Sequence, residues 1–189
     1  MTRIILCLVL AVSRLVSQEG TVFDSSLKEG LLCIARNDIQ TSMNYLRRGI
    51  NCFWLEKGLG TADLEGKINS LIAGENSHSK RAAYLVYAAV VEMANGPVRY
   101  DRAFVLLNDA QLEDPALPEV YNTRGVVLYS QRKWDAALTD YSKAIELNPR
   151  YVDAIRNRSD VYRQLGKLDL AVADFARFQD LLNSLYYQQ

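Results

Sequence analysis

Apolar residues recur at helical spacing along most of the chain beyond residue 24, and polar or glycine-bearing segments separate one stretch from the next. Spacings of three and four residues place such side chains on one face of an α-helix. The pattern predicts helices over the ranges 24–36, 39–57, 62–73, 80–94, 100–113, 118–131, 135–147, 152–165 and 169–186. Because no stretch shows the strict alternation typical of a β-strand, we expect an all-α fold.

The second half of the chain repeats itself at a 34-residue step, the interval from Pro115 to Pro149. At the same step aspartates recur at Asp101, Asp135 and Asp169, alanines at Ala103, Ala137 and Ala171, and large side chains at Leu107, Tyr141 and Phe175. Such a repeat is typical of stacked helix pairs, each too small to bury its apolar face alone. We expect three units, 84–117, 118–151 and 152–185, within a segment 80–189 that ends in a helical extension.

The middle unit resembles a tetratricopeptide repeat over its whole length, from Pro118 to Tyr151. The resemblance rests on the segments 121–125 (YNTRG), 134–138 (WDAAL) and 144–149 (AIELNP). The outer units depart from the pattern because Val91 and Ser159 stand where the middle unit has Gly125. The resemblance implies a TPR-like α-solenoid, which is a right-handed superhelix of stacked antiparallel helix pairs, and a protein that acts by binding other proteins.

Residues 1–18 have the layout of a secretory signal peptide. A basic start at Arg3 precedes an apolar run over 4–12, and residues 11–13 (AVS) supply a small-residue cleavage pattern. The run is shorter than the roughly 20 apolar residues that span a bilayer. We therefore expect cleavage and export to a periplasm or the exterior, with no membrane attachment afterwards. An uncleaved amino-terminal membrane anchor and a cytosolic protein with an apolar first helix are the alternatives.

Residues 19–79 precede the repeats and are expected to form a helical pair followed by a short helix. Small residues at Gly30, Ser42 and Gly49 fit a degenerate repeat, although no aromatic or proline residue marks its limits. Across this pair Cys33 and Cys52 would lie roughly 12 Å apart at helical rise, whereas bridged Cα atoms lie within about 7 Å. We expect two unbridged core cysteines, although a displaced turn would permit a disulfide.

Composition and charge weigh against several classes of function. Lys and Arg total 22 and Asp and Glu total 22, so no net positive field attracts nucleic acid. The single histidine, His78, lies in a polar linker, whereas a zinc site needs several His or Cys ligands at close spacing. The glycines at Gly58 and Gly60 lack the third glycine of a nucleotide-binding loop. We expect no catalytic residue, no cofactor and no metal.

The resemblance also implies a binding surface, because in tetratricopeptide-repeat proteins the first helix of each pair lines a concave groove that receives an extended peptide or a helix. Carried over by register, the groove residues are Leu85, Ala88 and Glu92 in the first unit, Glu119, Asn122, Val126 and Tyr129 in the second, and Asp153, Arg156, Asp160 and Arg163 in the third. Spacings of three and four residues place them on one face. The alternative is that this face is merely the solvated side of a short solenoid.

The last predicted helix is rich in apolar residues, namely Phe175, Phe178, Leu181, Leu182, Leu185, Tyr186 and Tyr187. Such a helix either covers its own repeat or contacts a partner or a second copy of the chain as a homodimer. The whole sequence predicts a non-enzymatic, exported scaffold that binds a protein or peptide segment in the groove. A self-assembling structural protein, joined through the last helix, and a membrane-tethered or cytosolic assembly factor are the alternative functions.

Overall fold

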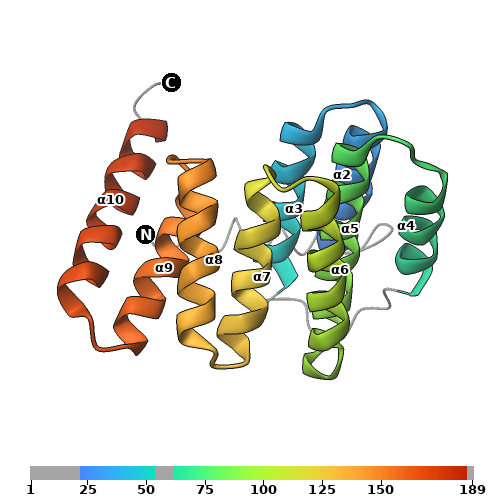
Figure 1. The fold of residues 1–189 in the computed structure, drawn as a ribbon. Helices are drawn as coiled ribbons and strands as arrows, with labels where there is room; N and C mark the ends of the chain where they lie inside the picture. The colour runs from blue at the N-terminus through green and yellow to red at the C-terminus, as the bar shows by residue number, and fades with distance from the viewer. Residues whose placement is uncertain (1–21, 54–61, 187–189) are drawn as a thin grey trace, which may run out of the picture.

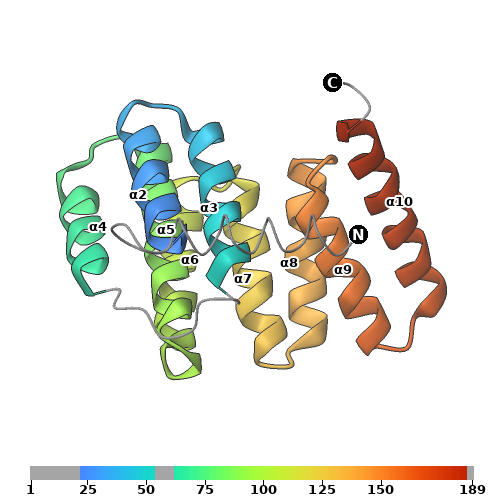
Figure 2. The same cartoon turned by 180° about the vertical axis from the view of Figure 1, so that it is seen from behind.

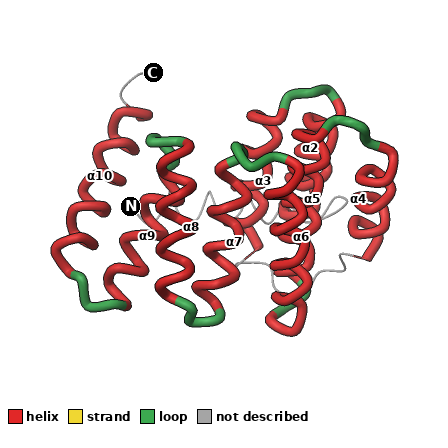
Figure 3. Tube along the Cα trace, viewed as in Figure 1, coloured by secondary structure: helices red, strands yellow, loops and turns green. Residues whose placement is uncertain are grey.

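The computed structural model describes residues 22–53 and 62–186, and every regular element in these ranges is a helix (Figure 1, Figure 3). The elements are α2 (Val22–Ala35), α3 (Ile39–Phe53), α4 (Ala62–Gly74), α5 (His78–Ala94), the 3-10 helix η1 (Pro97–Arg99), α6 (Tyr100–Glu113), α7 (Pro118–Ser130), α8 (Trp134–Leu147), α9 (Val152–Gln164) and α10 (Leu168–Tyr186). The predicted all-α fold class is confirmed. The predicted signal peptide lies outside the described residues.

Three antiparallel helical hairpins, α5–α6, α7–α8 and α9–α10, follow one another toward the carboxyl-terminal end and form an α-solenoid (Figure 1). The turns of the second and third hairpins share one backbone device. Arg132 has a φ of 59°, and Gly166, which lies one repeat step later, has a φ of 71°. A left-handed residue at this position ends a helix and redirects the chain. The repeat therefore extends to the conformation of the turns.

Gly125 sets the distance of closest approach between α7 and α8. A Cβ atom built on Gly125 would lie 2.6 Å from Cε1 of Tyr141, whose side chain is fully buried. The absence of a side chain at Gly125 thus leaves room for the Tyr141 ring on the crossing helix. In the first unit the equivalent positions hold Val91 and Leu107. Valine is larger than Gly125 and leucine is smaller than Tyr141, so the two changes offset each other in volume.

The amino-terminal hairpin α2–α3 packs on α5 and forms a second layer behind the row of repeats. Figure 2 shows α2 and α3 in front of α5, whereas Figure 1 shows α6 on the opposite side. Helix α4 flanks α5 at the end of the row, and α7 flanks it on the other side (Figure 1). Every residue of α5 from position 82 to 93 is buried. This enclosure explains why α5 is apolar around most of its circumference.

Tyr87 on α5 seats the amino-terminal hairpin. A Cβ atom built on Gly30 of α2 would lie 1.8 Å from the Tyr87 hydroxyl oxygen, so only glycine fits there. On α3, the Ser42 hydroxyl donates to the Tyr87 hydroxyl at 3.0 Å, and Tyr87 donates in turn to the Ser42 carbonyl. Burial raises the pKa of Tyr87 above its ordinary value, so the hydroxyl stays neutral. The small residues Gly30 and Ser42 therefore allow α2 and α3 to pack closely against Tyr87 of α5.

The cysteines of the amino-terminal hairpin were expected to be unbridged. Cys33, on α2, is a free cysteine with a partly buried side chain. The side chain of Cys52, near the end of α3, lies outside the described residues. None of the helices that the structure describes is both long and apolar enough to cross a membrane.

Candidate binding groove

A groove with a volume of about 510 Å³ opens between α3, α5, α7, α8 and α9. Seven of the predicted groove residues line it: Glu119, Asn122, Val126 and Tyr129 from α7, and Asp153, Arg156 and Asp160 from α9. They lie together because α7 and α9 are the first helices of adjacent hairpins and contact each other directly. The inner surface of the second and third repeats is therefore a concave site into which side chains of both helices project.

The remaining four predicted residues do not line the groove. Leu85, Ala88 and Glu92 are 7%, 5% and 1% exposed, because α5 is enclosed by its neighbouring helices. The Glu92 carboxylate is held at 3.1 Å by Arg99 and at 2.8 Å by Arg102. Carrying these positions over by register was wrong for the first repeat. The transfer failed because the amino-terminal hairpin α2–α3, which is not part of the 34-residue repeat, covers the inner face of the first repeat.

One end of the groove is apolar and includes residues that the register did not indicate. Met43 and Leu46 of α3 and Met93 of α5 line this end. Farther along, the rings of Tyr129 and Trp134 meet edge to face with centroids 4.8 Å apart. Methionine is flexible and polarisable, so such a surface adapts to apolar side chains of different shapes. The amphipathic pattern of α3 was the available signal, but it did not reveal what α3 packs against.

The charged residues of the groove differ in how they are paired. Asp160 accepts a hydrogen bond from Arg163 at 2.6 Å, which explains why the predicted residue Arg163 lies beside the groove. Glu119 and Asp153 are engaged in interactions of their own. Arg156 lies over the Phe178 ring, with its guanidinium carbon 6.0 Å from the ring centroid. Within the described part of the chain Arg156 forms no ion pair.

Arg132 adds a second cation to the groove. It lines the site from the turn between α7 and α8, where its left-handed backbone is uncommon for a residue other than glycine. Among the residues that the structure describes, it has no ionic partner. Arg132 and Arg156 are therefore exposed to whatever occupies the groove. An acidic side chain is the group that these two arginines would favour.

Polar groups in the floor of the groove are mostly satisfied, with one exception. The Asn157 side chain on α9 donates to the Asn122 side chain on α7 at 3.1 Å. The hydroxyl of Thr123, whose side chain is 2% exposed, is buried without a hydrogen-bond partner in the described structure. An unsatisfied buried hydroxyl costs about 1–3 kcal/mol. Thr123 lies in the wall of the groove, but its hydroxyl oxygen is itself buried.

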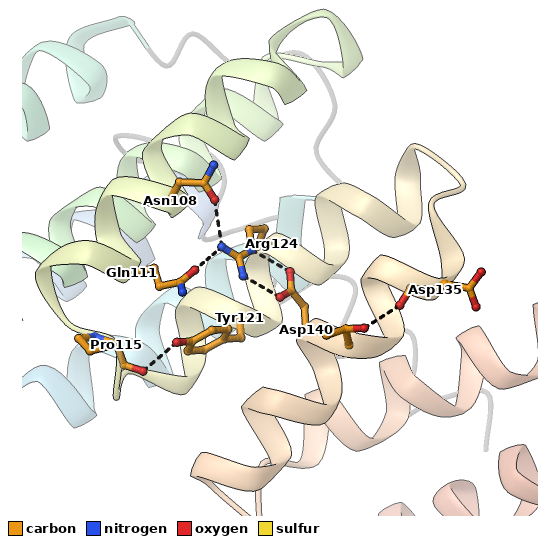
Figure 4. A network of polar contacts seen from close by, with 8 residues as sticks. Asn108, Gln111, Pro115, Tyr121, Arg124, Asp135 and Asp140 are labelled. Atoms are coloured by element: carbon orange, nitrogen blue, oxygen red, sulfur yellow. Dashed lines mark hydrogen bonds and ion pairs between the residues drawn. The ribbon is translucent and has the colours of Figure 1, made fainter.

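A separate polar network braces the repeats away from the groove (Figure 4). The Arg124 guanidinium on α7 donates to both carboxylate oxygens of Asp140 on α8, at 2.8 and 2.7 Å. Arg124 also reaches Asn108 and Gln111 on α6, and its bond to Asp140 raises the pKa of the guanidinium. One guanidinium thus ties the second hairpin to the first, and this network is structural.

The same brace recurs one repeat step later. Arg158 on α9 donates to both carboxylate oxygens of Asp174 on α10, at 2.7 and 2.8 Å, and reaches Ser142 on α8 at 3.3 Å. Such two-point pairs hold planar geometry well. The arginines and aspartates lie in register in the sequence, so the repeat itself was the signal that could have revealed them.

The described residues contain no group of three or more His, Cys, Asp or Glu side chains arranged to hold a metal ion. The Nδ1 atom of His78 lies 2.6 Å from the Glu113 carboxylate, and the histidine side chain is 80% exposed. A solvated pair of this kind fits a surface contact between α5 and α6. The arrangement of the groove suits recognition of another molecule.

The fold and groove define a class of protein, the α-solenoids built from helical hairpins. Residues 118–151 match the family model described as "Tetratricopeptide repeat", with the same limits as the unit predicted from the register. The second hairpin of the chain, α7–α8, is therefore a tetratricopeptide repeat. It is 35% identical over 63 residues to the tetratricopeptide repeat domain-containing protein PYG7, chloroplastic, of Arabidopsis thaliana. This match covers 33% of the chain and 21% of that relative, so the chain spans about a fifth of its length.

Solved structures agree with this fold. The chain is similar to MamA AMB-1, with a TM-score of 0.55 and 16% identity, over 84% of this chain and 98% of that chain. It is also similar to TTC0263, a thermophilic TPR protein in Thermus thermophilus, with a TM-score of 0.50 and 17% identity, over 84% of this chain and 91% of that chain. At this level of identity the similarity shows a shared fold.

Proposed function

We propose that this chain is a non-enzymatic, exported scaffold that binds a segment of a partner protein in the groove between α3, α7 and α9. A tetratricopeptide-repeat fold is that of a protein-interaction scaffold. The observation that carries the proposal is the composition of the groove. It combines an apolar end with two arginines, Arg132 and Arg156, that have no ionic partner in the described structure.

Charge reversal in the groove tests this function. We expect Arg156→Glu combined with Arg163→Glu to weaken capture of the native partner by about tenfold or more, because interfacial charges set both encounter rate and affinity. Arg163 is 65% exposed and Arg156 is also exposed, so helicity and melting temperature should change little. Capture is measured by crosslinking in the native host, followed by quantitative mass spectrometry.

A matched control separates site effects from net charge. Arg150→Glu combined with Lys167→Glu changes the net charge by the same amount at two exposed positions that do not line the groove. This control should capture the partner normally. If both double variants capture equally well, the groove assignment is wrong. If both lose capture equally, the effect is one of overall charge.

Export rests on the layout of residues 1–18, and a simple measurement decides it. Mass spectrometry of the mature protein from its native host should find an amino terminus near residue 18 or a few residues before it. An intact Met1 would contradict export through a cleaved signal and would favour the tethered or cytosolic assembly factor.

A second candidate function, self-assembly, is favoured by the exposure of α10. Leu168, Val172 and Phe175 are 62%, 68% and 47% exposed. The residues one step earlier are Trp134, Leu138 and Tyr141, which pack with Val161 of α9 and with Leu165, the residue that follows α9. The apolar face of α10 would therefore accept a further helix. Solution mass that rises with protein concentration and falls back to the monomer in Val172→Glu would support assembly, and a constant monomer mass would contradict it.

A further inference from the structure

The inner surface of the solenoid already carries one helix, α3. Exposure at equivalent positions, spaced one repeat step apart, is low in the first two repeats and higher in the third. Ala88 is 5% exposed, Asn122 is 7% exposed, and Arg156 is classed as exposed. At a second set of equivalent positions Leu85 and Glu119 are buried, at 7% and 6% exposed, whereas Asp153 is only partly buried. The layer formed by α2 and α3 thus covers the first repeat and leaves the third open.

The groove continues the interface between α3 and the solenoid. Met43 and Leu46 are 3% and 2% exposed and belong to the core that joins α3 to α5, yet both also line the groove. An occupant seated there would extend the same apolar interface from α3 toward α9. Helix α3, which packs on α5, shows that this inner surface accepts a helix.

Hydrogen bonding distinguishes a helical occupant from an extended one. An extended segment brings backbone N–H and C=O groups that need partners when they are shielded from water. The polar groups of the groove are in part already engaged with one another, because the Asn157 amide donates to the Asn122 oxygen and Asp160 accepts from Arg163. A helix satisfies its own backbone and needs mainly apolar and ionic contacts.

We propose that the partner segment is an amphipathic helix that lies beside α3, over α7 and α9. Its apolar side chains pack against the surface formed by Met43, Met93 and Val126, and an acidic side chain on its flank pairs with Arg156. This inference rests on the proposed function and specifies the conformation and charge of the partner. α3 is then part of the binding site as well as of the fold.

The test uses three designed peptides of about 15 residues, a length at which an isolated helix is marginally stable. The first has leucines at helical spacing flanked by glutamates. The second is the same peptide with a proline at its centre, which breaks the helix. The third has lysines in place of the glutamates. Binding of each labelled peptide to the full-length chain is measured by fluorescence anisotropy.

We expect the acidic helical peptide to bind about tenfold or more tightly than either of the others. Arg156→Glu should remove the preference for glutamate over lysine, and because this position is exposed, unfolding would not explain such a change. Val126→Glu should weaken the acidic helix about tenfold, whereas Val105→Glu, at a 56% exposed valine on α6, should not. Circular dichroism verifies that each variant is folded.

Equal binding of the proline peptide and the helical peptide would overturn the inference in favour of an extended occupant. Preference for the lysine peptide would overturn the charge assignment. If none of the peptides binds saturably while Arg156→Glu with Arg163→Glu still loses the native partner, the helical inference fails and the proposed function stands. If that double variant also retains the partner, both fail.

Discussion

The first repeat and the two that follow share one repeat step but hold their helices together by different chemistry. In the second repeat the buried pair is Arg124 and Asp140, and in the third it is Arg158 and Asp174. In the first repeat the equivalent residues are Val90 and Leu106, which pack within the main core. Ionic and apolar pairs therefore occupy the same place in one architecture.

The surroundings of each repeat account for this difference. Helix α5 contacts α2, α3, α4, α6 and α7, so a charged group on it would lie deep in the core. Transfer of a charge to such a site costs several kcal/mol unless the pairing is excellent. The braces of α7 and α9 lie away from the groove, and Arg124 and Arg158 keep 14% and 17% of their side-chain surface exposed. An ion pair is tolerated where part of it remains hydrated.

The largest effect is expected when the ionic brace loses one member. Arg124→Met should destabilise the protein by about 3–5 kcal/mol, because Asp140 then lies buried without its cation. Denaturant titration measures the loss. Arg124→Val combined with Asp140→Leu copies the first repeat and should restore most of the stability. A double variant as unstable as the single one would show that the two chemistries are not interchangeable.

A somewhat smaller loss is expected from the tight contact between α7 and α8. Gly125→Val places side-chain atoms against the Tyr141 ring and should cost about 2–3 kcal/mol by overpacking. Adding Tyr141→Leu reproduces the Val91 and Leu107 pair of the first repeat. A thermal melt of both variants should show partial recovery in the double one. Additive losses would mean that the two positions do not compensate.

Loss of the contact between Tyr87 and the amino-terminal hairpin should destabilise mainly α2 and α3. Tyr87→Phe removes the hydrogen bonds to Ser42 and should cost about 1 kcal/mol. Amide hydrogen exchange should quicken in α2 and α3 and stay unchanged in α9 and α10. Tyr121→Phe is the control, because Tyr121 lies one repeat step later and bonds the Pro115 carbonyl at 2.9 Å. Its effect should stay within the α6–α7 connection.

The smallest change in stability, and one of opposite sign, is expected at Thr123. Its equivalent in the first repeat is Ala89, which has no polar atom in its side chain. Thr123→Val removes a buried, unsatisfied hydroxyl at nearly constant volume and should stabilise the fold by up to about 1 kcal/mol. Partner affinity should change little in the same variant, because the hydroxyl oxygen is buried beneath the groove surface. A large loss of affinity would show that a bound group reaches this hydroxyl.

Much of the groove could be predicted because register carries positions from one repeat to the next. Asn122 and Arg156 lie at one position of the repeat and both line the site. Ala88 lies at the same position but is buried, since α3 is not part of the repeated pattern. The apolar sequence of α5 around most of its circumference was a local sign that more than one layer covers it.

Local pattern alone determined the helices, their turns and the pairing of α5 with α6, α7 with α8 and α9 with α10. These features depend on contacts between residues that are close in sequence or one repeat apart, and the sequence pattern behind them recurs in each repeat. Only the tertiary structure decided where the amino-terminal hairpin lies, that it closes one end of the groove, and which charges remain unpaired. Those outcomes depend on contacts such as that between Ser42 and Tyr87, two residues that are 45 positions apart. Such a contact does not recur in the described repeats, so no repeating pattern in the sequence predicts it.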